Sequence, residues 1–141
     1  DLYNLELRPL AYAYLCLYVK DINSDTSYYS NNTLSIYRNI SDYDPQTVTW
    51  NTTPETDSVI RLNIPTSDMK NYMKINITSI VNSWIKDGNN YGITIEASNY
   101  YSSLVKFASA NSKNPPLLFV EYKNPKFDYN IFDDYQTHSF R

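Results

Sequence analysis

Residues 75–95, INITSIVNSWIKDGNNYGITI, constrain the fold most, because their hydrophobic period changes twice. Apolar side chains alternate at Ile75 and Ile77, recur at helical spacing in the middle, and alternate again near the end. This pattern predicts a strand, a short α-helix over residues 79–86 and a second strand. The helix is expected to close one end of the fold. Its inward positions are Ile80, Val81 and Trp84.

Both ends of this helix carry residues that suit helix termini. Thr78 is expected to be the N-cap, accepting hydrogen bonds from the first free amides, and Gly88 to take the left-handed position just past the C-terminus. The chain has two glycines, Gly88 and Gly92, and both lie in this stretch. We therefore expect the two backbone positions where a side chain would be costly to flank one turn.

Composition and charge narrow the class of protein. With 15 tyrosines and 16% aromatic residues among 141, the chain favours strands and is long enough for one domain with its own core. A net charge of -3 and the lack of a Lys or Arg cluster argue against binding to nucleic acid or to an anionic membrane surface. No apolar run would span a bilayer, and no signal peptide opens the chain, so a mature form or a fragment is expected.

Residues 11–19 alternate cleanly and predict a strand with two different faces. One face is apolar, and the opposite face carries Tyr12, Tyr14 and Tyr18 with the single cysteine, Cys16. A neighbouring loop or a second sheet would cover such a row. Alternatively, the row is a flat aromatic platform for sugar rings or for another protein surface.

Residues 21–32 are predicted to be a polar loop, and their first, third and fifth positions have the spacing of a calcium loop. The match ends there, because Thr26 stands where the motif requires glycine and Asn32 where it requires glutamate. Ordinary turn chemistry, in which Asn and Asp side chains bond their own backbone, is the favoured interpretation. No metal and no cofactor are predicted.

Later segments predict more short strands separated by polar turns. Trp50 shares one face of a short strand with Val48, ended by Pro54, and is interpreted as a core anchor rather than a ligand stacker. The unbroken run LLFVEY suits a strand near the centre of a sheet. Together these strands predict an all-β, jelly-roll β-sandwich with one short helix. The expected strands are residues 34–40, 48–50, 59–64, 93–97, 104–108 and 117–122.

Three blocks, in this order, carry a family resemblance: AYLCLY at residues 13–18, TVTWN at 47–51 before Pro54, and the capped helix followed by Asn-Tyr-Gly at 90–92. In these blocks the chain resembles the disaggregatase-related repeat, or DNRLRE domain, over residues 11–122. The resemblance implies a jelly-roll module, similar in shape to carbohydrate-binding modules, in a secreted, surface or cell-wall protein. The matched residues look structural in that family, and a fold does not determine a function.

Two departures from the family pattern stand out. Tyr43 and Pro45 occupy positions where the family has tryptophan and glutamate, which weakens any ligand role there. The family also begins with strands ahead of the Ala-x-Leu strand, whereas residues 1–10 alone precede it here. A sandwich without those strands would expose sheet edges, which are prone to pair with other chains.

The chain is therefore divided into a sandwich, residues 1–123, and an aromatic extension, residues 124–141, that is too aromatic for a disordered leash. We hypothesise that the extension supplies strands to its own sandwich or to the next subunit. Head-to-tail exchange between subunits builds a filament if the rotation does not close. The candidate strand-donor residues are Phe127, Tyr129, Ile131, Phe132, Tyr135 and Phe140.

No catalytic group is expected. The single histidine, His138, lies in the extension and Cys16 lies within a strand, so no Cys–His pair or metal cluster assembles. The carboxylates at residues 42–44 and 133–134 are interpreted as solvated turn residues rather than as a glycosidase pair.

Two functions therefore remain for an extracellular or cell-surface protein that is not an enzyme. The favoured one is a structural module that self-associates into a filament or layer. The alternative is a carbohydrate-binding module that takes polysaccharide as its partner. The residues expected at the ligand site or interface are Tyr12, Tyr14, Tyr18, Tyr100 and Tyr101.

Overall fold

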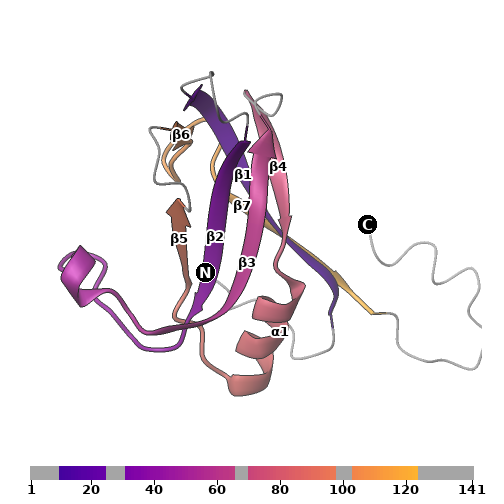
Figure 1. Ribbon diagram of the computed structural model, residues 1–141. Helices are drawn as coiled ribbons and strands as arrows, with labels where there is room; N and C mark the ends of the chain where they lie inside the picture. The colour runs from indigo at the N-terminus through magenta and orange to yellow at the C-terminus, as the bar shows by residue number, and fades with distance from the viewer. Residues whose placement is uncertain (1–9, 25–30, 66–69, 98–102, 124–141) are drawn as a thin grey trace, which may run out of the picture.

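The computed structural model describes residues 10–24, 31–65, 70–97 and 103–123, and these form two antiparallel sheets and one α-helix (Figure 1). The predicted all-β sandwich with one short helix is confirmed. Sheet A consists of β1 (Leu10–Ser24), β4 (Asn71–Asn76), β6 (Ser103–Phe107) and β7 (Leu117–Tyr122). Sheet B has the order β3 (Thr56–Pro65), β2 (Asn31–Asn39), β5 (Ile93–Ala97).

Strand β1 organises sheet A because it pairs with three other strands. One of its edges pairs with β4, and the other pairs first with β7 and then with β6. With 15 residues it is longer than the predicted strand at 11–19. The polar segment 21–32 is therefore not one loop, because its first four residues belong to β1 and its last two to β2.

The core lies between the inward faces of the two sheets and is closed by the helix. Ala13, Leu17 and Val19 from β1 are buried against apolar residues of β2, β3 and β4. Full burial of a valine or leucine side chain contributes about 1.5–3 kcal/mol. The largest fully buried side chains are Leu10, Val19, Ile36, Ile64, Ile77, Ile80 and Val81.

Helix α1 (Thr78–Asp87) lies at one end of the sandwich, as predicted (Figure 1). Ile80, Val81 and Trp84 are its buried residues. Gly88 has φ 71° and donates its N–H to the Trp84 carbonyl at 3.0 Å, which ends the helix in the left-handed conformation. Gly92 also has a positive φ, 80°, so the prediction for both glycines is confirmed.

The predicted N-cap was wrong. Thr78 is the first helical residue and Ile77 occupies the N-cap position. The Thr78 hydroxyl accepts from the Ala13 N–H at 2.9 Å and donates to Asn76 Oδ1 at 2.6 Å. Asn76 Oδ1 also accepts from the Thr78 N–H at 3.1 Å. The hydroxyl thus joins the helix start to β1, since it is bonded to the strand and not to the free amides of the helix.

The prediction of a strand with Trp50 in the core was also wrong. Residues 50–52 form a 3₁₀ turn, η1 (Trp50–Thr52), in the long connection between β2 and β3, and Trp50 is 80% exposed. The connection projects from the sandwich with η1 near its tip (Figure 1). No strand forms here because the backbone amides make hydrogen bonds within the loop. The N–H groups of Thr47 and Val48 donate to the Asp44 carbonyl at 3.1 and 2.9 Å.

Strand β7 occurs where LLFVEY predicts a strand, but not at the centre of a sheet. Among the described strands it pairs with β1 alone, and its side chains alternate between exposed and half-buried. Leu117 and Phe119 point away from the core and are 49% and 58% exposed. An unbroken apolar run here reflects an apolar outer face rather than burial on both faces.

Candidate functional site

The outer face of sheet A gathers the aromatic side chains of three strands. Alternation along β1 turns Tyr12, Tyr14 and Tyr18 away from the core. The antiparallel register places Phe119 opposite Tyr14, Leu117 opposite Cys16, and Tyr72 opposite Tyr18. Residues directly opposite in adjacent strands share a face. We define the aromatic face as Tyr12, Tyr14, Tyr18, Tyr72, Leu117 and Phe119.

One end of the aromatic face is partly open to solvent. The rings of Tyr12 and Tyr14 are stacked, with centroids 6.0 Å apart and planes inclined by 22°. Tyr12 is 48% exposed, and Phe119, across from Tyr14, is 58% exposed. Exposed apolar side chains that lie together on one face often mark a site of contact with another molecule.

The other end of the aromatic face is more tightly held. Tyr18 and Tyr72 meet edge to face, with centroids 5.3 Å apart and planes at 77°. The Tyr72 hydroxyl donates to the Pro115 carbonyl at 2.9 Å, and both rings are half-buried. This end fixes the segment leading into β7, which positions Leu117 and Phe119.

Polar and charged groups border the open rings. The ammonium of Lys74 lies 6.0 Å from the centroid of the Tyr14 ring, and Asn76 faces Tyr14 from β4. Glu121 faces Tyr12 from β7. All three are exposed and offer hydrogen-bond donors and acceptors beside an apolar surface. Cys16, on the same face, is a free thiol but is 7% exposed and so buried.

This arrangement suits a ligand that has an apolar face and polar edges. A pyranose ring presents C–H groups on its faces and hydroxyls around its rim, so its face packs on an aromatic ring while its hydroxyls bond to polar neighbours. Within residues 10–24, 31–65, 70–97 and 103–123, no His, Cys, Asp and Glu groups cluster closely enough to hold a metal ion. In the same part of the chain, no helix is long and apolar enough to cross a membrane.

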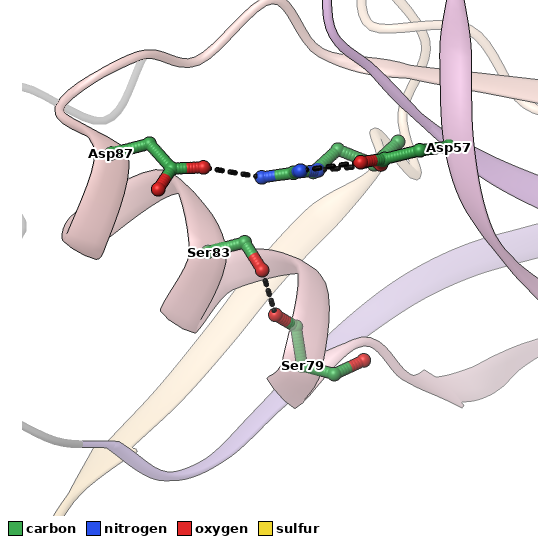
Figure 2. Close-up of polar contacts among 5 residues, drawn as sticks. Asp57, Ser79, Ser83 and Asp87 are labelled. Atoms are coloured by element: carbon green, nitrogen blue, oxygen red, sulfur yellow. Dashed lines mark hydrogen bonds and ion pairs between the residues drawn. The ribbon is translucent and has the colours of Figure 1, made fainter.

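A charged cluster outside the aromatic face joins β2 and β3 of sheet B to the helix. The guanidinium of Arg38 donates to both oxygens of Asp57, at 2.7 and 2.6 Å, and to Asp87 at 2.8 Å. Figure 2 shows the two carboxylates on opposite sides of this group, beside the Ser83–Ser79 bond of α1, 2.9 Å. Hydrogen bonds from Arg38 lower the pKa of Asp57, and both carboxylates raise the pKa of Arg38. Both carboxylates are occupied, so the cluster is a structural contact.

The structure brings together part of the predicted site. Tyr12, Tyr14 and Tyr18 lie on one face of β1, and their role in binding stays a prediction. Tyr100, Tyr101 and the six strand-donor residues of the extension lie outside the described residues. Sequence reasoning missed Tyr72, Lys74, Leu117 and Phe119. Alternation within residues 117–122 places Leu117 and Phe119 on one face, but nothing local reveals that this face adjoins the tyrosines.

Comparison with known proteins agrees with this chemistry. Residues 7–122 match the model of carbohydrate-binding module family 96. The chain is also similar to the tRNA nuclease WapA of Bacillus subtilis strain 168, with 31% identity over 106 residues, 71% of this chain and 4% of the relative. The tRNA3(Ser)-specific nuclease WapA of Bacillus spizizenii has the same identity and coverage. The chain thus spans about 4% of the length of these curated relatives.

Proposed function

Because the chain belongs to carbohydrate-binding module family 96, we propose that it binds a polysaccharide through the aromatic face of sheet A. The observation that carries the proposal is the stacked pair of exposed Tyr12 and half-buried Tyr14, with exposed Phe119 directly across from Tyr14. Rigid aromatic side chains contribute large contact areas at low cost in conformational entropy. Lys74, Asn76 and Glu121 at the border supply the polar contacts that would orient the sugar hydroxyls.

We test this with affinity gel electrophoresis against soluble polysaccharides, followed by calorimetric titration of those that retard the protein. Tyr14→Ala and Phe119→Ala should each weaken binding about fivefold or more, since each removes a central ring of the contact. Thermal stability should change little for Phe119→Ala, because that ring is more than half exposed.

Val59→Ala is the matched control. Val59 is 41% exposed and belongs to β3 in sheet B, so its truncation removes apolar surface away from the aromatic face. Its affinity should equal that of the parent. Binding that survives both ring truncations, or that falls equally in the control, would place the ligand elsewhere.

The role proposed is binding without catalysis, and family membership supports it. We propose that the protein acts outside the cell or at the cell surface, as its resemblance to the DNRLRE domain implies. The resemblance to the DNRLRE domain fits the same function. The nuclease activity in the names of the relatives is not proposed for this chain, which corresponds to about 4% of their length.

A second candidate function is self-association, in which the aromatic face packs against another copy of the chain. The exposure of Leu117 and Phe119 on a strand with one described pairing partner favours it. Family membership favours the polysaccharide, which we therefore take as the main proposal.

A further inference from the structure

Trp50 is the most exposed large hydrophobic residue of the described chain, at 80%. Tryptophan is usually well buried, because its apolar area is the largest of any side chain. Trp50 belongs to η1, which lies in the connection between β2 and β3, whereas the aromatic face belongs to sheet A. The turn η1 is thus a separate feature of the molecule, near the tip of a projecting loop (Figure 1).

The loop that carries Trp50 is held by its own hydrogen bonds. The Thr49 N–H donates to Thr52 Oγ1 at 2.8 Å, and the Thr52 N–H donates to the Thr49 carbonyl at 3.0 Å. Earlier in the loop, Asp44 accepts from the backbone N–H of Gln46 at 2.9 Å through its side chain. A turn bonded in this way restricts the backbone that carries the indole, which lowers the entropy lost on binding.

The two ends of the loop are also bonded to each other at its base. The Ile40 N–H donates to the Glu55 carbonyl at 2.8 Å, and the Glu55 N–H donates to the Ser41 hydroxyl at 2.8 Å. The Tyr43 hydroxyl lies beside Gly92. If Gly92 were replaced by a residue with a Cβ atom, that atom would lie 3.6 Å from the hydroxyl oxygen. The loop is therefore closed at its base, and Tyr43 lies beside the residue that precedes β5.

The charge of the loop limits what the indole would contact. Residues 40–55 include the exposed carboxylates of Asp42, Asp44 and Glu55 and no Lys or Arg. An anionic polymer would be repelled here. The exposed residues around Trp50 are Thr49, Asn51, Thr52 and Thr53, which offer hydroxyl and amide groups.

We propose that Trp50 is a second carbohydrate contact, which stacks on the face of an uncharged sugar ring and is independent of the aromatic face. The proposal rests on the proposed carbohydrate-binding function. An aromatic ring supplies the stacking surface, small polar neighbours meet the hydroxyls, and the acidic surroundings select a neutral sugar over a uronate. A module with two such contacts would hold two segments of polysaccharide.

The test uses the fluorescence of the two tryptophans. Trp84 is buried, so collisional quenching by acrylamide reports mainly on Trp50. The probes are the neutral polysaccharides galactomannan, xyloglucan and mixed-linkage β-glucan, with polygalacturonate as the anionic comparison. At least one neutral probe should shift the emission to shorter wavelength and protect Trp50 from quenching.

Variants separate this contact from the aromatic face. Trp50→Ala should weaken binding of the responding probe about fivefold or more and abolish the fluorescence response, whereas Trp50→Phe should keep most of the affinity. Gln46→Ala, which truncates another exposed side chain of the loop, should match the parent. Tyr14→Ala should leave the Trp50 response in place.

Three results would overturn the inference. If a neutral probe binds without changing the fluorescence and Trp50→Ala binds it equally well, the Trp50 contact is wrong while the proposed function stands. If Trp50 responds to polygalacturonate alone, the assignment of a neutral sugar is wrong. If no probe binds the parent protein, both the inference and the proposed function fail, and a protein partner becomes the explanation for the exposed indole.

Discussion

At the scale of single residues, the two tryptophans of the chain have opposite environments. Trp84 lies at a helical position whose neighbours Ile80 and Val81 also face the core, and it is 9% exposed. Trp50 lies in a turn with no sheet partner and is 80% exposed. The indole N–H of Trp84 is buried and has no hydrogen-bond partner within the described residues. A buried donor without a partner costs about 1–3 kcal/mol.

Trp84→Ala should lower the free energy of unfolding by about 3–5 kcal/mol, because it leaves a cavity where the helix meets the core. Trp84→Phe should cost clearly less, since it keeps much of the ring volume and removes the unpaired N–H. Urea denaturation followed by circular dichroism measures both. An alanine variant that unfolds like the parent but loses a ligand would instead make Trp84 a binding residue.

At the scale of the elements, a β-bulge between β2 and β3 sets the direction of the Arg38 side chain. β2 and β3 shift register between Tyr37 and Arg38, so that Arg38 pairs with Asp57 and Ser58 is the extra residue on β3. Ser58 has φ 49°, a left-handed conformation common in bulges. The shift places Asp57 and Arg38 on one face, and Arg38 reaches Asp87 of α1 from there. The bulge thus enables the contact that joins sheet B to the helix.

Asp57 should make stability depend on pH in acid. Its pKa is lowered from 3.8 by the hydrogen bonds from Arg38, so the folded state favours the ionised carboxylate. The stabilisation is complete above the ordinary pKa and is lost as the pH falls below it. Asp57→Asn should therefore show a smaller loss of unfolding free energy than the parent between about pH 4 and pH 2.

Denaturation curves at a series of pH values across this window give the comparison. Glu55→Gln, which neutralises an exposed carboxylate in the neighbouring loop, is the control and should keep the slope of the parent. Parallel curves for Asp57→Asn and the parent would show that the ion pair with Arg38 does not contribute to folding. The effect should be modest, since Asp57 is 41% exposed in the pair.

At the scale of the whole molecule, the aromatic face is available either to a polysaccharide or to another copy of the chain. The main proposal predicts that the protein sediments as a monomer over about 10–100 μM, because weak contacts of exposed rings do not form stable dimers without a larger buried area. Analytical ultracentrifugation tests this. Self-association would instead give a concentration-dependent sedimentation coefficient that Phe119→Asp returns to the monomer value.

The sequence by itself determined the features that depend on neighbours along the chain. A period of two identified the strands and the tyrosine row of β1, a period of 3.6 identified α1 and its inward residues, and the glycines at the end of that helix and shortly after it were expected to have positive φ. These patterns reflect backbone geometry over a few residues. They can therefore be recognised in the sequence without knowledge of the rest of the molecule.

Only the tertiary structure decided which segments meet. β1 pairs with strands about 50 to 110 residues away, and this pairing places Tyr72, Leu117 and Phe119 beside the tyrosines. It also left Trp50 without a sheet to cover it. Which strands pair depends on how well both sheets and the helix pack together as a whole. The hydrophobic period of a single segment carries no information about that packing. The local pattern identified one row of the aromatic face, and the long-range pairing completed it.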